Sequence, residues 1–87
     1  MTPEQITQLI QAALPQAQIE VRSVDNKHFS ARLIGPEFEG LRPLARHQLI
    51  YRSLGERMGR EIHALTIEAY TPQEWAARAR QGSPARG

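Results

Sequence analysis

Hydrophobic positions recur every three or four residues in two parts of the chain, a spacing typical of amphipathic helices. The first helix is predicted over residues 2–13, because Thr2 and Pro3 form a helix start and Pro15 stops the pattern. The second is predicted over residues 43–58 and ends near Gly59. The apolar stripe of this second helix comprises Leu44, His47, Ile50, Leu54 and Met58.

Alternation of apolar and polar residues predicts three strands. Residues 19–24 and 29–33 are expected to form a hairpin across the short Asp25-Asn26-Lys27 turn, and Gly35-Pro36 ends its second strand. The third strand is predicted over residues 62–70, with Leu65, Ile67 and Ala69 sharing one face. The chain therefore contains a hairpin and, after the long helix, a separate third strand.

A last helix is predicted to run from the Thr71 cap to about Arg80. Thr71 and Glu74 have the spacing of a capping box, and Tyr70 is placed to pack on Trp75 as a hydrophobic staple. The resulting order is α-β-β-α-β-α, which predicts an α+β fold of the class II KH-like type: a three-stranded mixed sheet with helices packed on one face. We expect one domain over residues 1–80 and a disordered tail over residues 81–87.

Composition narrows the possible chemistry. The 87 residues suffice for one modest core, and the sequence contains no cysteine, which excludes thiolate nucleophiles and an iron–sulfur or zinc site built from this chain's own thiolates. No nucleophile elbow, phosphate-cradling glycine loop or zinc-protease string is present, so we expect a binding protein rather than an enzyme. With no apparent secretory signal or membrane-length apolar segment, a cytoplasmic location is expected.

Two of the three histidines can be interpreted from the sequence alone. His63 begins the third strand in the same alternation as Leu65, which predicts an imidazole at the mouth of the core face, either hydrogen-bonded as scaffolding or available as a ligand. His47 lies on the apolar stripe of the long helix and is expected to be a half-buried structural histidine.

Three strings in this order and spacing resemble the BolA family, in particular its short bacterial branch. They are Phe38-Glu39-Gly40-Leu41, then Ala45-Arg46-His47 leading into Leu49-Ile50-Tyr51 and Leu54, and finally Ile62-His63-Ala64-Leu65 followed by Tyr70-Thr71-Pro72 and Glu74-Trp75. The resemblance spans about residue 4 to residue 76. It implies the KH-like fold and partnership with a monothiol glutaredoxin.

The same resemblance implies a [2Fe-2S] cluster shared with that partner, which supplies thiolate ligands and glutathione while this chain supplies histidine. His63 falls on the family's ligand histidine. His28 is either a second ligand or an ordinary exposed turn histidine, because the loop that often carries a second ligand in the family is short here. No membrane and no small-molecule substrate is expected as a partner.

The resemblance also indicates where the partner would bind. Arg46 and His47 resemble helix-positioning or partner-contact residues, and Arg42 and Ala64 are added as partner contacts. In the alternative function, a DNA-binding transcriptional or stress-response regulator, basic residues of the long helix contact phosphates. These are Arg42, Arg46, Arg52, Arg57 and Arg60. The Gly-x-x-Gly loop of nucleic-acid-binding KH domains is not found between the helices.

Overall fold

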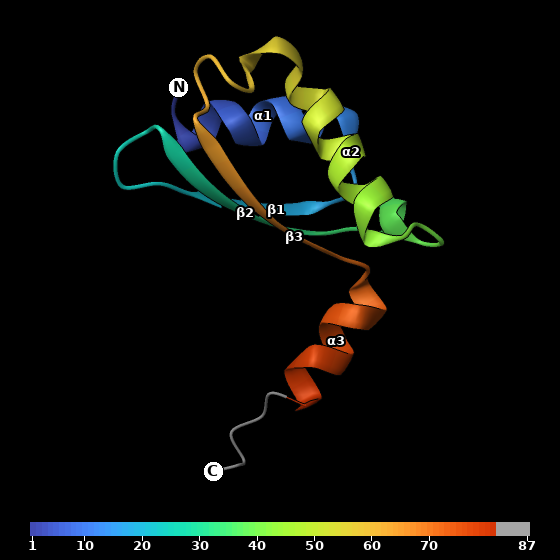
Figure 1. The fold of residues 1–87 in the computed structure, drawn as a ribbon. Coiled ribbons are helices and arrows are strands. Elements are labelled where there is room, and N and C mark those ends of the chain that lie inside the picture. Colours follow the sequence, from blue (N-terminus) through green and yellow to red (C-terminus); the bar gives the residue numbers. More distant parts are fainter. Residues whose placement is uncertain (82–87) are drawn as a thin grey trace.

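The computed structural model describes residues 1–81, and residues 82–87 of the predicted tail lie outside the described part. The α-helices, β-strands and 3-10 helices (η) follow the predicted order (Figure 1). They are α1 (Pro3–Ala13), β1 (Gln18–Arg22), β2 (His28–Ile34), η1 (Pro36–Phe38), α2 (Pro43–Leu54), η2 (Gly55–Arg57), β3 (Ala64–Tyr70) and α3 (Pro72–Gln81). Within residues 1–81 no helix combines the length and the apolar composition needed to cross a membrane.

The three strands form one mixed sheet in the order β1-β2-β3. β1 and β2 are antiparallel and joined by a short turn, as predicted, whereas β3 returns through α2 to lie parallel to β2. The parallel register pairs His28 with Ala64 at one end and Ile34 with Tyr70 at the other. The end of the sheet next to the β1–β2 turn is called the hairpin end below.

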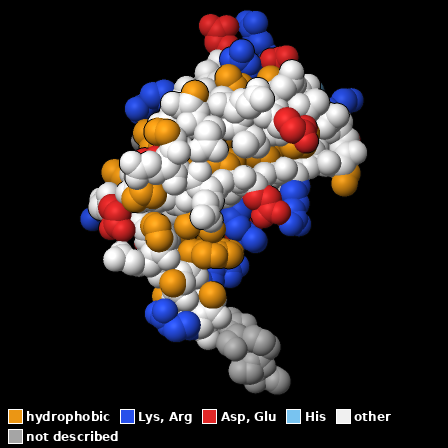
Figure 2. All heavy atoms as spheres, turned by 180° about the vertical axis from the view of Figure 1, so that it is seen from behind, with side chains coloured by type: hydrophobic (Ala, Val, Ile, Leu, Met, Phe, Trp, Pro, Cys, Tyr) orange, Lys and Arg blue, Asp and Glu red, His pale blue; other side chains and the backbone are white. Residues whose placement is uncertain are grey.

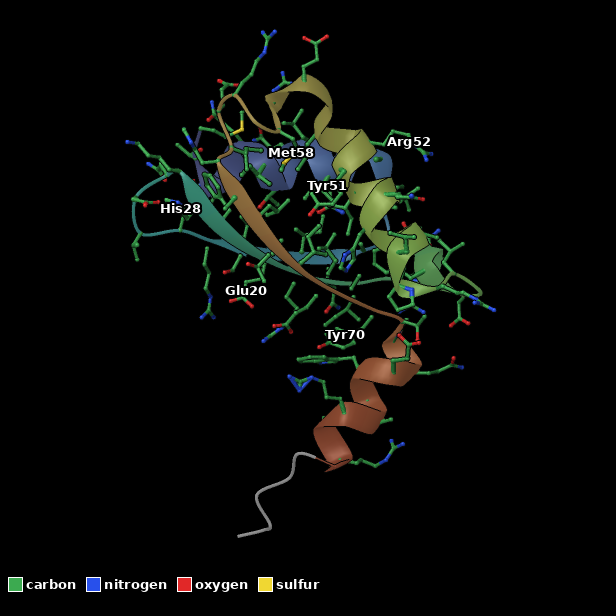
Figure 3. The ribbon with its side chains drawn as sticks, in the orientation of Figure 1. Glu20, His28, Tyr51, Arg52, Met58 and Tyr70 are labelled. Atoms are coloured by element: carbon green, nitrogen blue, oxygen red, sulfur yellow. The ribbon has the colours of Figure 1, made fainter. Side chains whose placement is uncertain are left out.

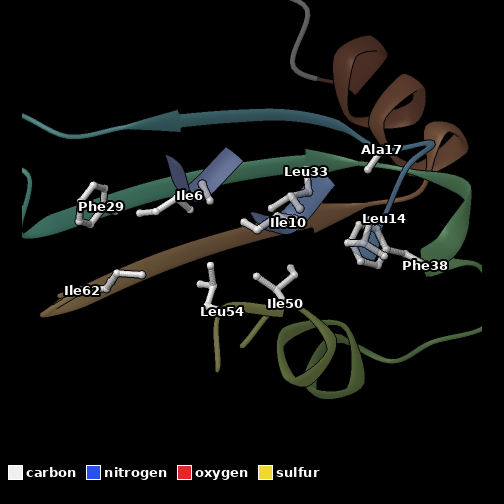
Figure 4. Packing of buried hydrophobic residues seen from close by; sticks show 11 residues of the cluster. Ile6, Ile10, Leu14, Ala17, Phe29, Leu33, Phe38, Ile50, Leu54 and Ile62 are labelled. Atoms are coloured by element: carbon white, nitrogen blue, oxygen red, sulfur yellow. The ribbon is translucent and has the colours of Figure 1, made fainter. Parts of the chain in front are cut away.

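Helices α1 and α2 cover one face of the sheet and enclose the core (Figures 1 and 4). Alternate residues of β2 point into this layer because strand side chains alternate between faces. The buried cluster comprises Ile6, Ile10, Leu14, Ala17, Phe29, Ala31, Leu33, Phe38, Ile50, Leu54 and Ile62. The predicted helix-covered face of the sheet is therefore confirmed for the first two helices.

Helix α3 leaves the end of β3 on the other side of the sheet (Figure 1). Its capping box is present as predicted, with Thr71 N–H donating to Glu74 Oε1 at 2.9 Å and Glu74 N–H donating to Thr71 Oγ1 at 3.1 Å. The staple is present too, since the rings of Tyr70 and Trp75 lie 5.3 Å apart between centroids. The guanidinium of Arg32, from β2, lies 4.9 Å from the Trp75 ring and fixes the helix beside the sheet.

The long helix is shorter than its sequence pattern predicts. α2 ends at Leu54, and Gly55 adopts φ 59° and ψ −134°, a conformation that side chains disfavour. Met58 continues the helical spacing in the sequence, but in the structure it pairs with Ile62 in an isolated bridge. The residues after Leu54 therefore form a compact turn that leads to β3.

Candidate functional site

Segments that are far apart in the sequence meet at the hairpin end of the sheet. The N–H groups of His63 and Ala64 both donate to the carbonyl of Lys27, at 2.9 and 3.3 Å. Ala64 is in turn the register partner of His28. The fold thus brings the two predicted ligand histidines to the same end of two neighbouring strands.

His63 lies one residue before β3, and its side chain is exposed. The predicted third strand began at Ile62, but Ile62 forms only an isolated bridge and the strand begins at Ala64. Strand alternation therefore does not set the direction of the His63 ring, and its place at the mouth of the core face stays a prediction. An exposed imidazole is accessible to a partner protein.

His28, labelled in Figure 3, is the first residue of β2. A carboxylate of the preceding turn holds its ring. Its Nδ1 lies 2.8 Å from Asp25 Oδ2, while the backbone N–H groups of Lys27 and His28 each donate to Asp25 Oδ1 at 2.9 Å. Two thirds of the His28 side chain is exposed, at 66%. The ring is therefore oriented by a hydrogen bond on one side and open to solvent.

The turn that carries Asp25 is fixed by its own side chains. The N–H of Asn26 donates to Ser23 Oγ at 2.9 Å, and Ser23 Oγ donates to the His28 carbonyl at 2.7 Å. Asn26 adopts φ 58°, a left-handed conformation that asparagine tolerates better than most residues. Bonds from the His28 backbone N–H, the His28 ring and the Lys27 N–H hold the pKa of Asp25 well below its usual range.

Arg46 lies away from this end of the sheet and is buried, with 9% of its side chain exposed. Its guanidinium donates to the Leu41 carbonyl at 2.8 Å, to the Ala69 carbonyl at 3.0 Å, and to both carboxylate oxygens of Glu74 at 2.6 and 3.0 Å. The bond to Arg46 is the main cause that lowers the pKa of Glu74 to about 2, and the bond to Glu74 raises the pKa of Arg46. These contacts favour helix positioning over direct partner contact for Arg46.

The remaining predicted partner contacts do not form one cluster. Arg42 occupies the N-cap position of α2, and Arg46 in the next turn of that helix bonds the Ala69 carbonyl at the far end of β3. Ala64 lies at the opposite end of that strand, and seven extended residues span about 20 Å. His47 is half-buried on α2, as predicted.

The basic face proposed to bind DNA contains fewer available arginines than the sequence suggests. Arg46 is turned inward to Glu74, and Arg57 lies in η2, 3.9 Å from Glu61. Arg42, Arg52 and Arg60 are exposed. Figure 2 shows the opposite side of the molecule from Figure 1, where basic and acidic side chains are both spread over the surface.

The donor groups suit a metal centre that a second protein completes. The sequence has no cysteine, and among residues 1–81 no group of three or more His, Cys, Asp and Glu side chains could hold a metal ion. A [2Fe-2S] cluster takes four ligands, commonly cysteine thiolates, and imidazole replaces thiolate in known centres. Two exposed imidazoles at one end of the sheet fit part of such a ligand set.

The sequence pattern identified Asp25 only as part of a turn and not as a residue of this site. The spacing Ser23-x-Asp25 before a strand marks side-chain to backbone bonds in turns, and this signal explains the bonds to Lys27 and His28. It does not indicate that the second carboxylate oxygen reaches the imidazole. Only the folded turn places the two groups together.

Comparison with known proteins gives a consistent set of relatives. A family model described as BolA-like protein matches residues 6–74. An uncharacterized protein from the rpoN-murA intergenic region of Acinetobacter guillouiae is 40% identical over 76 residues, which cover 86% of this chain and 90% of that protein. The DNA-binding transcriptional regulator BolA of Vibrio cholerae is 46% identical over 48 residues, 55% of this chain and 45% of the regulator.

Solved structures agree with these relatives. The structure of a bolA protein homologue from Coxiella burnetii superposes with a TM-score of 0.76 at 38% identity, covering 87% of this chain and 97% of the homologue. This similarity shows that the α+β fold with a three-stranded mixed sheet is that of the BolA structures.

Proposed function

Since this chain belongs to the BolA family, we propose that it binds a monothiol glutaredoxin and co-ligates a [2Fe-2S] cluster with it. The complex would serve iron–sulfur assembly, trafficking or iron sensing. The observation that carries the proposal is the pair of exposed histidines, His63 and His28, at the hairpin end of a chain without cysteine. Such a chain contributes imidazole but needs thiolates from outside.

The division of ligands follows from the donor set. His63 would supply one imidazole and His28 a second, while the glutaredoxin and its glutathione would supply thiolates. A histidine ligand must be neutral to bind, so protonation competes with the metal and makes the bond easier to release than a thiolate bond. A shared cluster held in this way is suited to transfer or sensing rather than to permanent electron transfer.

The surface around the histidines carries charges of both signs. Lys27 and Arg60 are exposed near the histidines, and so are the acidic Asp25 and Glu61. Ala64 belongs to the same end and stays a predicted contact. Arg42 and His47 remain predicted contacts on α2, separated from the histidines along β3.

The proposal is tested by following a reconstituted cluster in visible absorption and circular dichroism. A monothiol glutaredoxin is loaded with [2Fe-2S] and glutathione, and this protein or its His63→Ala variant is added. We expect the wild type to convert the glutaredoxin homodimer into a spectrally distinct heterodimer, and His63→Ala to lose the distinct spectrum. Because His63 is exposed, the variant should keep its melting temperature.

A matched control replaces an exposed residue at the other end of the sheet. Gln18 pairs with Ile34, far from the hairpin end, so Gln18→Ala should convert the homodimer as the wild type does. An identical spectrum from wild type and His63→Ala would remove His63 from the ligand set. No conversion with the wild type would refute the proposal itself.

DNA binding is the alternative, favoured by the name of the Vibrio cholerae relative and by the exposed arginines of α2 and the turn after it. Phosphate contacts release counterions, so affinity for duplex DNA would fall steeply with salt. Reversal of charge at Arg52 would then weaken the DNA complex, whereas His63→Ala would leave it unchanged. If the Arg52 variant keeps the affinity of the wild type for DNA, the phosphate contacts are refuted and the cluster-binding function is favoured.

A further inference from the structure

We infer that Asp25 is a positioning residue for His28, which holds the imidazole with its proton on Nδ1 and leaves the Nε2 lone pair free to bind a metal. The inference deepens the proposed function and rests on it, because it assigns a role within the ligand set that His28 would share with a partner. It concerns this chain's own side chains and is testable before any cluster is added.

The direction of the hydrogen bond follows from the chemistry of the two groups. An ionised carboxylate only accepts hydrogen bonds, and Asp25 Oδ2 lies 2.8 Å from His28 Nδ1. The proton therefore resides on Nδ1, and in the neutral ring Nε2 is the unprotonated nitrogen. Within the described part of the chain Nε2 makes no hydrogen bond, and the 66% exposed ring leaves it accessible.

A carboxylate behind a histidine is a common feature of metal sites. Ligating histidines usually donate their second ring N–H to a carboxylate or carbonyl, which fixes the tautomer and makes the ligating nitrogen more basic. An ordinary exposed turn histidine needs no such partner. The turn also supports a positioning role for Asp25, because Ser23 and the left-handed conformation of Asn26 hold Asp25 in place independently of the ring.

Asp25→Asn separates the two roles of this side chain. The backbone N–H groups of Lys27 and His28 require an acceptor at Oδ1, so the amide oxygen takes that position and the turn is kept. The amide NH₂ then faces His28 Nδ1. An NH₂ group only donates, so the ring moves its proton to Nε2, where it blocks the ligating lone pair.

Ser23→Ala is the matched control. Ser23 bonds Asn26 N–H, the His28 carbonyl and Asp25 but not the His28 ring. The variant therefore loosens the turn, while the Lys27 and His28 N–H groups still hold the Asp25 carboxylate. If Asp25 acted only as a turn residue, Asp25→Asn, which keeps the turn, would behave like the wild type, and Ser23→Ala, which loosens the turn, would have the larger effect.

The first measurement is the tautomer of His28 in the free protein, read from long-range ¹H–¹⁵N correlations at about pH 8, where imidazole groups are mostly neutral. We expect the Nδ1–H form in the wild type and in Ser23→Ala, and mainly the Nε2–H form in Asp25→Asn. Retention of the Nδ1–H form in Asp25→Asn would overturn the inference.

The second measurement is the midpoint for converting the cluster-loaded glutaredoxin into the mixed species. Loss of an outer carboxylate typically weakens metal binding by 10–100-fold, so Asp25→Asn should need roughly tenfold more protein or fail to convert it. Ser23→Ala should stay within about twofold of the wild type. A wild-type midpoint in Asp25→Asn would also overturn the inference.

The two proposals fail in different ways. If His63→Ala abolishes the mixed spectrum but Asp25→Asn and His28→Ala do not change it, the proposed function stands and the role of Asp25 is refuted. If the wild type forms no mixed species, the proposed function fails first, and the role assigned to Asp25 falls with it even where the tautomer is as expected.

Discussion

At the residue scale, Arg46 connects three parts of the molecule through one guanidinium. It joins the carbonyl before α2, the carbonyl at the end of β3 and the capping carboxylate of α3. A buried arginine without such partners would be costly, and its five donors match the planar carboxylate of Glu74. Arg46, which lies in a family motif of the sequence, therefore has a structural role in holding parts of the fold together.

The Arg46–Glu74 pair predicts a specific loss of stability in acid. The pKa of Glu74 is lowered from 4.5 to about 2, so the carboxylate stabilises the folded state above pH 4.5 and this contribution is lost as the pH falls toward 2. Glu74→Gln keeps an acceptor for the Thr71 N–H but removes the charge. The difference in unfolding free energy between wild type and Glu74→Gln should therefore shrink between these pH values.

Urea unfolding across that pH range measures the difference, and carbon NMR of the Glu74 carboxyl group gives its titration directly. Asp25 has a lowered pKa as well and destabilises both proteins in acid, so only the difference between wild type and variant reports on Glu74. A difference that stays constant down to pH 2 would contradict the assignment.

At the element scale, the end of α2 is set by one glycine against a favourable sequence pattern. Ile50 and Leu54 lie in the core at helical spacing, and Met58 continues the spacing beyond the helix. The pattern alone therefore predicted a helix four residues too long. Gly55, with φ 59° and ψ −134°, redirects the chain so that Met58 can meet Ile62 and His63 can reach the Lys27 carbonyl.

Gly55→Ala is expected to destabilise the protein by about 1–3 kcal/mol, because a side chain at this backbone conformation is strained. No neighbouring atom obstructs an added Cβ, so the cost comes from the backbone alone. Gln48→Ala, at an exposed position within α2, should change stability by less than about 0.5 kcal/mol. Chemical denaturation checks both, and equal stability of Gly55→Ala and the wild type would disprove the strain.

Features that depend on a few neighbouring residues were predictable from the sequence. The capping boxes of α1 and α3, the β1–β2 turn and the packing of Tyr70 on Trp75 all follow from short spacings. The inward turn of Arg46 and the approach of His63 to the hairpin were not predictable from spacing, because each needs residues brought together by the whole fold. The resemblance named the two histidines, and the structure adds the carboxylate behind one of them.

At the scale of the whole molecule, α3 is attached to the domain without being part of its core. No residue of α3 belongs to the buried cluster. The helix is held instead by the bidentate pair of Glu74 with Arg46 and by the stack of Trp75 with Arg32 and Tyr70. The core formed by α1, α2 and the sheet should therefore fold without α3, and with it the hairpin end that carries the histidines.

A chain that stops after Thr71 tests this division through Arg46. We expect it to unfold cooperatively at lower stability than the full chain, and to keep the amide chemical shifts of the hairpin end. Arg46→Met in the full chain should cost about 1–3 kcal/mol, since bonds to a charged partner and to two carbonyls are lost.

In the shortened chain the same substitution should cost clearly less, or even stabilise, because Arg46 has already lost Glu74 and its charge lacks a carboxylate partner. The four unfolding free energies form a double-mutant cycle whose coupling term isolates the interaction between Arg46 and α3. Gln48→Ala, which touches neither group, should cost the same in both chains. An equal cost of Arg46→Met in both chains would mean that the pair with Glu74 contributes little, and that the aromatic stack alone fixes α3.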